Sequence, residues 1–214
     1  MLDFTVVVPV YNTIPEHLLE GVMSIVNQTI EQDYTINIID DGSTNAETLR
    51  MLKYLSKIPK VKVQYLKENV GVAEVLNGFH KSCTNKYIAV CGSDDIQHKD
   101  KFKLQVEYLV NNPDVSVLST QLYGFNDSDI ERKPLFKSEH KLECHPKVKG
   151  DKRDFWIANH GTVIYKNDDV IAAGGYDPKL RRAQDVDLWK RMYANGCKFR
   201  CLQRVLYGWR RFIS

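Results

Sequence analysis

Short apolar runs alternate along this chain with longer stretches in which apolar residues recur at helical spacing. The runs at 4–12 and 87–91 contain few polar residues, which is typical of strands buried on both faces of a parallel sheet. Further strands are predicted at 35–39, 61–66, 115–120 and 161–165. Helices are predicted at 15–26, 46–58, 72–83, 99–112, 168–173 and 183–194. This alternation predicts an α/β fold with a mostly parallel central sheet flanked by helices.

Residues 124–153 interrupt the alternation, because they are polar and rich in Lys, Glu and His with scattered Pro. A stretch of this length without a strand or helix pattern is either functional or mobile, and we expect a loop here that could act as a lid. Residues 205–211 are expected to form a final strand or an ordered tail. We therefore expect a single domain over 1–214, with one half over about 1–120 and another over about 121–214.

Composition and charge narrow the class of protein. The 214 residues have 43% hydrophobic and 27% charged side chains, as in an ordinary soluble globular protein. A net charge of +3 is too small to predict a nucleic-acid partner. No apolar run is long enough to span a bilayer, and no basic segment of a signal peptide precedes the first strand. We expect a cytoplasmic protein without a transmembrane segment.

The five cysteines agree with a reducing compartment. Their number is odd, and no two of them have the Cys-x-x-Cys spacing, so reduced and largely buried thiols are the simplest interpretation. A zinc site is an alternative that matches no familiar ligand spacing, and it would use His140, Cys144 and His145, with Cys197 and Cys201 as further ligands.

Two apolar strands run directly into paired carboxylates. Asp40 and Asp41 follow the strand at 35–39, and Asp94 and Asp95 follow the strand at 87–91. In open α/β sheets, ligands bind at the carboxyl edge, where both pairs would lie. Adjacent carboxylates repel each other, and a nearby cation such as Mg²⁺ or Mn²⁺ would relieve the repulsion. The alternative is a solvated turn that happens to carry two acids.

Four motifs occur in order along the chain: Pro9-Val10-Tyr11-Asn12, Asp40-Asp41-Gly42-Ser43-Thr44, Ser93-Asp94-Asp95 and Gln184-Asp185-Val186-Asp187-Leu188-Trp189. Together they resemble the family 2 inverting glycosyltransferases with the GT-A fold. Glu68-Asn69-Val70-Gly71 is similar to the family's Asn-x-Gly segment, and Gly174-Gly175-Tyr176-Asp177 is similar to its Gly-Gly-Phe-Asp turn. The resemblance runs from about residue 4 to 211, and no glycine-rich dehydrogenase or P-loop motif is present.

The resemblance implies a GT-A-type sheet whose first half is Rossmann-like and binds a nucleotide sugar, with an acceptor half after it. The donor would be a nucleoside diphosphate sugar, with UDP as the expected nucleotide. The residues implied at the donor are Pro9, Tyr11, Asn12, Asp40, Asp41, Ser43, Asn69, Gly71, Ser93, Asp94, Asp95 and Arg210.

Particular roles follow for some of these residues. Tyr11 would lie against the base, and Asp41 or Asp40 would accept the imide N–H of uracil or thymine. Asp94 and Asp95 would bind the ribose and a Mn²⁺ or Mg²⁺ ion on the diphosphate. The alternatives are a core or rim tyrosine and acids that only satisfy turn backbone. For Arg210, the implied phosphate contact stands against a solvated surface arginine.

Asp185 is the residue that the resemblance implies as the catalytic base, deprotonating the acceptor hydroxyl opposite the leaving diphosphate. A carboxylate in the first turn of a helix is also explained by the helix N-terminus alone. Trp156, His160 and Gly161 lie where the family places part of its acceptor pocket, although Trp156 is equally explained as a core residue. The expected partners are a glycan, lipid or protein acceptor, and a homodimer is possible.

Three positions depart from the family's pattern: Gly92 replaces a carboxylate, Leu76 replaces an arginine, and Gln184 replaces the Glu of the Glu-Asp pair. We predict an inverting hexosyl- or hexosaminyltransferase of glycan biosynthesis. These departures support the alternative of a nucleotide-sugar-binding or scaffold protein that has lost turnover. A sugar nucleotidyltransferase is a third hypothesis, and it lacks the glycine-rich basic loop expected after the first strand.

Overall fold

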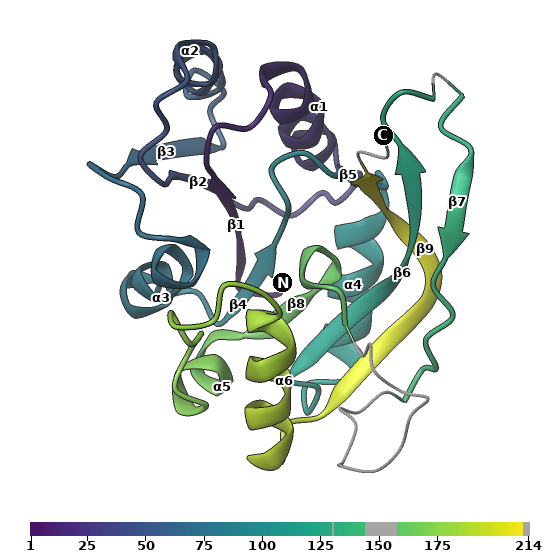
Figure 1. The fold of residues 1–214 in the computed structure, drawn as a ribbon. Helices are drawn as coiled ribbons and strands as arrows, with labels where there is room; N and C mark the ends of the chain where they lie inside the picture. Colours follow the sequence, from purple (N-terminus) through teal and green to yellow (C-terminus); the bar gives the residue numbers. More distant parts are fainter. Residues whose placement is uncertain (130, 144–157, 212–214) are drawn as a thin grey trace.

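The computed structural model describes residues 1–129, 131–143 and 158–211, and a nine-stranded sheet runs through them (Figure 1). The strands lie in the order β3 (Val61–Tyr65), β2 (Ile36–Asp40), β1 (Phe4–Val10), β4 (Tyr87–Val90), β8 (Ile164–Lys166), β6 (Val117–Asn126), β9 (Phe199–Arg211) and β5 (Ile96–Gln97). β7 (Pro134–Lys137) pairs with the outer part of β6.

The direction of the strands changes at β8. β3, β2, β1 and β4 are parallel, whereas β8 is antiparallel to both of its neighbours. Beyond it, the long strands β6 and β9 are again parallel to each other. The predicted α/β fold with a mostly parallel sheet is therefore confirmed. The predicted boundary between the two halves, near residue 120, lies inside β6. One sheet continues through both halves.

Helices cover both faces of the sheet (Figure 1). One face packs against α1 (Pro15–Val26), α2 (Ala46–Leu55) and α4 (Lys101–Asn111). The other face packs against α3 (Val72–Ser82), α5 (Asn167–Ala172) and α6 (Gln184–Ala194). In β1, Val6 and Val8 join the first core while Val7 joins the second, so successive residues are buried on opposite sides. This explains why the run shows no polar alternation.

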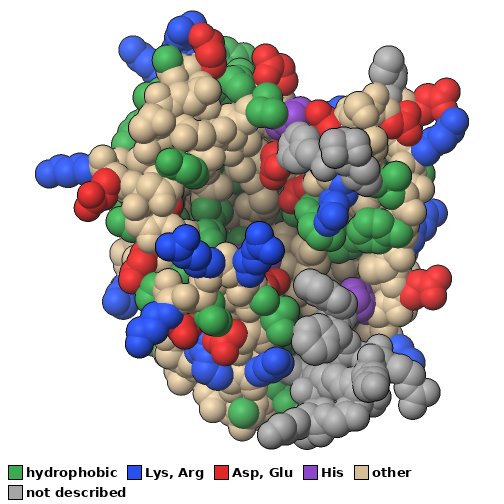
Figure 2. Space-filling view, viewed as in Figure 1, with side chains coloured by type: hydrophobic (Ala, Val, Ile, Leu, Met, Phe, Trp, Pro, Cys, Tyr) green, Lys and Arg blue, Asp and Glu red, His purple; other side chains and the backbone are tan. Residues whose placement is uncertain are grey.

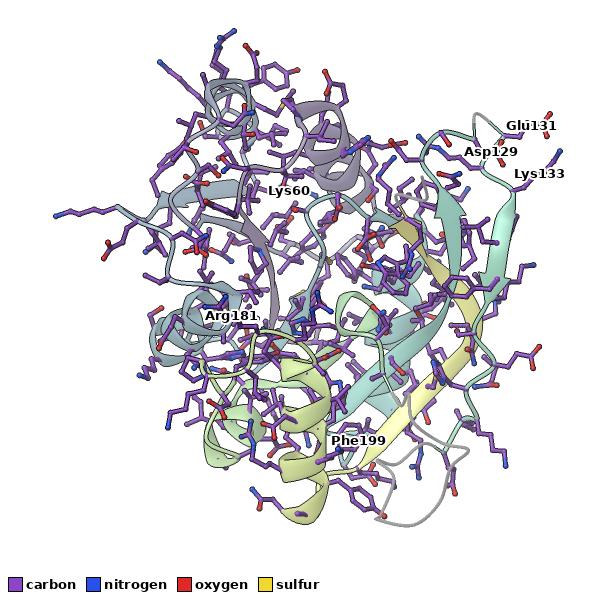
Figure 3. All side chains as sticks on the ribbon, in the orientation of Figure 1. Lys60, Asp129, Glu131, Lys133, Arg181 and Phe199 are labelled. Atoms are coloured by element: carbon purple, nitrogen blue, oxygen red, sulfur yellow. The ribbon has the colours of Figure 1, made fainter. Side chains whose placement is uncertain are left out.

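The expected loop over 124–153 is only partly correct. β6 continues to Asn126, and β7 returns antiparallel to it, so a hairpin occupies the first part of this stretch. All four residues of β7 are exposed, and the strand therefore has no buried apolar pattern. Glu131 and Lys133, between the two strands, point away from the body of the protein (Figure 3). Residues 144–153 lie outside the described residues.

Other element boundaries also differ from the prediction. The segment expected as a strand at 161–165 begins with a 3-10 turn, η1 (His160–Thr162), before β8. The last strand starts at Phe199 rather than near 205, and the two-residue strand β5 was not predicted. β5 has too few residues to show a pattern, and its pairing with Tyr207 and Gly208 defines it.

Among the described residues, no helix is both long enough and apolar enough to cross a bilayer. The cysteines in this part of the chain are free thiols, and Cys91 and Cys201 are buried. Within these residues there is also no group of three or more His, Cys, Asp or Glu side chains that could hold a metal ion. Two of the residues named for a zinc site, Cys144 and His145, lie outside the described part of the chain.

Candidate active site

The loops that follow β1, β2 and β4 meet at the carboxyl edge of the parallel strands. Asn12 joins the first two of these loops, since its side-chain Oδ1 accepts the backbone N–H groups of Thr44 and Asn45 at 2.9 Å each. Its own backbone N–H donates to Ser43 Oγ at 2.9 Å. Asn12 has a φ of 48°, a left-handed conformation that asparagine tolerates better than most residues. Tyr11 beside it is 49% exposed, so the alternative of a core tyrosine is wrong.

Asp41 holds the segment before α3. Its carboxylate accepts the backbone N–H of Val70 at 2.7 Å and that of Gly71 at 2.9 Å. Both Asp40 and Asp41 are buried, and Asp40 accepts the N–H of Ser43 at 3.3 Å. The loops after β2 and β3 are thus connected by side chains that accept backbone donors.

The close approach of these loops requires glycine between them. Gly42 has a φ of +69°, and a Cβ there would lie 2.5 Å from the carbonyl carbon of Glu68. Asn69 in the same segment is exposed, whereas Pro9 lies within β1 opposite Ile39. These predicted donor residues therefore surround one edge of the sheet.

The two acids after β4 differ in their surroundings. Asp95 is 7% exposed and uses both oxygens, because Oδ1 accepts the N–H of Arg210 at 2.8 Å and Oδ2 accepts the Tyr207 hydroxyl. Burial, together with the charge of Asp94, raises the pKa of Asp95 to about 7. The Asp94 carboxylate is half-buried and makes no hydrogen bond to the described residues. Ser93 Oγ lies 2.8 Å from Thr13 Oγ1.

This pair of acids fits a divalent cation in one respect. Two adjacent carboxylates, one of them poorly solvated, form an electronegative position, and Asp94 is available as an oxygen ligand. A carboxylate at position 92 would not fit the present arrangement, because a Cβ on Gly92 would overlap Asp95 Oδ2. Asp94 is therefore the better placed of the two predicted metal ligands.

Arg210 is buried rather than solvated, and its side chain is 1% exposed. Its Nε donates to the backbone oxygen of Asp94 at 2.7 Å, Nη2 donates to Glu20 Oε2 at 2.6 Å, and Nη1 pairs with Asp127. Hydrogen bonds from Arg132 and Arg210 hold the pKa of Glu20 below its usual value despite partial burial. The solvated alternative is wrong, and the guanidinium is engaged within the protein rather than turned toward a ligand.

Asp185 lies in the first turn of α6 and is half-buried. Burial lowers the pKa of His160, and the charge of Asp185 opposes this shift. His160 Nε2 lies 2.7 Å from the Tyr176 hydroxyl. Asp185 thus acts on His160 through its charge, and no hydrogen bond or ion pair joins these two predicted site residues within the described part of the chain. Trp156, the third predicted acceptor residue with His160 and Gly161, lies outside the described residues.

Gly161 connects the acceptor residues to the acids. Its carbonyl oxygen accepts from the buried Lys101 Nζ at 3.2 Å. A Cβ on Gly161 would overlap the Tyr207 hydroxyl, which in turn donates to Asp95. Figure 2 shows a hollow in the middle of the surface that faces the viewer, and acidic side chains lie on part of its rim.

Sequence reasoning missed Tyr207 and Lys101. Lys101 had a usable signal, because it lies on the same helical stripe as Phe102, Gln105 and Leu109, all of them buried. A lysine on an apolar stripe indicates a buried polar contact. Tyr207 had no comparable signal, since its partners are distant in the sequence.

Comparisons with known proteins agree with this arrangement. A family model described as "Glycosyl transferase family 2" matches residues 5–168. The chain is 28% identical over 210 residues to the UDP-Gal:alpha-D-GlcNAc-diphosphoundecaprenol beta-1,3-galactosyltransferase of Escherichia coli, covering 97% of this chain and 74% of that protein.

Two solved structures share the fold at low sequence identity. TarS 1–349 of S. aureus in complex with UDP-GlcNAc superposes with a TM-score of 0.79 at 20% identity, covering 100% of this chain and 60% of that one. The mannosyltransferase PcManGT of Pyrobaculum calidifontis, in complex with GDP-Man and Mn²⁺, gives 0.71 at 17% identity, covering 96% and 56%. The expected GT-A fold is thereby confirmed. The chain spans about three fifths of the solved chains that it matches.

Proposed function

Because this chain belongs to glycosyl transferase family 2, we propose that it is an inverting glycosyltransferase acting on a nucleoside diphosphate sugar, with UDP as the nucleotide. One observation carries the proposal. Contacts run from the Asp94–Asp95 pair through Tyr207 to Gly161, which follows His160 in the chain, and the charge of Asp185 acts on the imidazole of His160. These links support a donor site and a candidate base that belong to one site, as group transfer requires.

The donor is proposed to bind at the loops after β1, β2 and β3. The exposed ring of Tyr11 offers a flat surface for a base. The carboxylates of Asp40 and Asp41 lie nearby, and Asp41 also fixes the segment with Asn69 and Gly71. A UDP-sugar is favoured because the E. coli relative is named for UDP-Gal and TarS was solved with UDP-GlcNAc.

A divalent ion, Mn²⁺ or Mg²⁺, is proposed to be held by Asp94, with Asp95 beside it. When bound, it would neutralise charge on the leaving diphosphate. Such ions commonly use one or two protein carboxylates and complete their coordination with substrate phosphates, so the small ligand set is sufficient. The Mn²⁺ in the PcManGT structure is consistent with this proposal.

Asp185 is proposed to accept the proton of the acceptor hydroxyl. The acceptor oxygen then forms a bond to the anomeric carbon as the bond from that carbon to the diphosphate oxygen breaks, and the diphosphate leaves with the bonding electrons. A base on the face opposite the leaving group produces inversion at that carbon. Asp185 lies in the first turn of α6, where the N-terminal end of the helix dipole favours negative charge.

A second candidate is a nucleotide-sugar-binding protein without turnover, and one observation favours it. Both carboxylate oxygens of Asp95 already accept hydrogen bonds within the protein, and Gly92 has no carboxylate, so fewer oxygen ligands remain for a metal ion. By contrast, the substitution at Leu76 is explained as packing, because its side chain is fully buried in α3.

The test is calorimetric titration of the chain with UDP, GDP and dTDP, each with Mn²⁺ and with EDTA. Hydrolysis of sugar nucleotides carrying the best-bound base is then measured. We expect metal-dependent binding of UDP and slow hydrolysis of a UDP-sugar. Binding of no nucleotide would overturn the donor site, whereas binding without hydrolysis or transfer to any of a panel of glycan acceptors would favour the second candidate.

A further inference from the structure

A continuous row of hydrogen-bonded polar side chains ends at His160. His160 Nε2 is 2.7 Å from the Tyr176 hydroxyl, which is 3.2 Å from the Tyr165 hydroxyl. The Tyr165 hydroxyl is 3.0 Å from His80 Nε2, and His80 Nδ1 is 2.7 Å from Asn167 Oδ1. We call these five residues the polar row. All except His160 are at most 4% exposed, so water does not replace these bonds.

The row has a defined direction that is set at Asn167. The side-chain nitrogen of Asn167 lies 3.1 Å from the carbonyl oxygen of Cys83 and 3.3 Å from that of His80. Carbonyl oxygens only accept, so the donor end of the amide must face them. The amide oxygen therefore faces His80 Nδ1, which has to carry the proton of that bond.

Each hydrogen bond then decides which atom donates in the next hydrogen bond along the row. Burial lowers the pKa of His80 to about 4, so the ring is neutral near neutral pH and its Nε2 is an acceptor. The Tyr165 hydroxyl must donate to it. Because a hydroxyl has one proton, the Tyr165 oxygen accepts from Tyr176, and the Tyr176 oxygen accepts from His160.

We propose that the polar row fixes His160 as its Nε2–H tautomer and thereby leaves a bare Nδ1 on this imidazole. His160 is then a positioning residue that can only accept a hydrogen bond at Nδ1. Within the described residues, Nε2 makes the only hydrogen bond of this ring. The inference rests on the proposed role of Asp185 as the base.

The consequence for the proposed reaction concerns the acceptor hydroxyl. The opposite tautomer would place a proton on Nδ1, and His160 would then present a donor instead of an acceptor at that nitrogen. With Nδ1 bare, His160 and the Asp185 carboxylate both present acceptors, and both favour a group that donates, such as a hydroxyl of a sugar acceptor.

The experiment reads the tautomers directly. Long-range ¹H–¹⁵N correlation spectra of the uniformly ¹⁵N-labelled full chain distinguish the protonated from the bare nitrogen of each of its six histidines. The variants His80→Gln and His160→Gln assign the two signals. We expect opposite tautomers, with the proton on Nδ1 of His80 and on Nε2 of His160. A proton on Nδ1 of neutral His160 would overturn the proposal.

Breaking the row tests whether it causes the tautomer. In Tyr176→Phe, we expect His160 to become a mixture of tautomers while His80 keeps its own. Tyr34→Phe is the matched control, since its hydroxyl is also buried and donates to the carbonyl oxygen of Ile25 at 2.5 Å. If Tyr176→Phe fails to fold, Tyr165→Phe interrupts the row one bond further along. An unchanged His160 tautomer in a folded variant would overturn the proposal.

Activity supplies the second readout. With the best donor, Tyr176→Phe is expected to lower kcat several-fold with an unchanged KM for the donor, whereas Tyr34→Phe leaves both unchanged. Equal kcat in the wild type and Tyr176→Phe would overturn the role in turnover. The spectra need no substrate. An inactive wild type with the expected tautomers would therefore contradict the proposed function alone, while an active wild type with the wrong tautomer would contradict only this inference.

Discussion

Two regions of the site are held together in different ways. In the region of β1 to β4, functional side chains accept backbone N–H groups of neighbouring loops, as Asn12 and Asp41 do. In the region of η1, β8 and α5, side chains form hydrogen bonds to one another, as in the polar row. A side chain that accepts a backbone donor acts alone and shapes one loop. A row of side chains acts as a unit, because the proton of each member decides what its neighbour can do.

Because the two regions are held together in different ways, we expect mutations to separate nucleotide binding from turnover. The largest effect is expected for Asp185→Asn, which removes the base without changing the size of the side chain. Transfer should fall by about 10²–10⁴-fold, while nucleotide affinity measured by calorimetry stays unchanged.

Asp187→Asn is the matched control for Asp185→Asn. Asp187 lies in the same helical turn and forms a half-exposed ion pair with Arg191 at 2.7 Å. Its replacement should cost about 1 kcal/mol of stability or less and leave transfer nearly intact. Full activity of Asp185→Asn would exclude the base assignment and the division between the two regions.

Arg210 is where the comparison could break, because one side chain makes both kinds of contact. It donates to the backbone carbonyl oxygen of Asp94, and it also pairs with the side chains of Glu20 in α1 and of Asp127 after β6. Arg210→Met should lower the free energy of unfolding by about 3 kcal/mol, since partly buried carboxylates lose their cation.

Urea unfolding measures this loss, with Arg132→Met as the control. Arg132 also pairs with Glu20, but its side chain is 38% exposed, and we expect a loss of about 1 kcal/mol or less. Equal losses in the two variants would show that the buried position of Arg210 adds nothing.

Asp41→Ala tests the loop-shaping bonds. Two backbone N–H groups lose their acceptor, and we expect a loss of roughly 1–3 kcal/mol in stability together with weaker UDP binding. Asn45→Ala also removes an acceptor of two backbone donors, at the start of α2. It should cost about 1 kcal/mol in stability without changing UDP affinity in a calorimetric titration. Equal UDP affinity in both variants would argue against a donor site at Asp41.

The smallest effect sharpens the description of the polar row. The pKa of His80 is about 4 in the folded chain, because the ring is buried, and its ordinary value is 6.5, so the unfolded chain binds more protons between these two pH values. Stability should therefore fall as pH drops through this window, by up to roughly 1.4 kcal/mol per pH unit.

Urea unfolding at a series of pH values measures the slope. His80→Gln should flatten it relative to the wild type, whereas His98→Gln, at an exposed position, should leave it unchanged. An identical slope in His80→Gln and the wild type would mean that His80 is not buried as a neutral ring.

The same difference between the regions explains what the sequence could reveal. The strands β1 and β4 were predictable because burial on both faces leaves an apolar run, and the acids after β2 and β4 follow their strands directly. Features that arise within one short segment leave a pattern in the sequence of that segment. The exposed strand β7 and the two-residue strand β5 leave none.

Side-chain contacts between distant segments were the part that could not be predicted. Arg210 was expected at a phosphate, yet its partner Glu20 is 190 residues away along the chain. His80, Tyr165 and Tyr176 come from different elements, and no spacing links them. Only the fold brings these side chains into contact.

The Tyr207 hydroxyl packs against two residues without side chains, Gly92 and Gly161. The residue types that positions 92, 161 and 207 tolerate therefore depend on one another. A methyl group at Gly161 would overlap the hydroxyl itself, and one at Gly92 would overlap the Asp95 carboxylate that accepts its hydrogen bond. Restoring a carboxylate at position 92 is therefore not a simple reversion toward the family pattern. It requires Asp95 to move away from the Tyr207 hydroxyl and the Arg210 N–H that hold it, so we expect relatives with tyrosine at 207 to have glycine at 161, and those that also keep Asp95 to have glycine at 92.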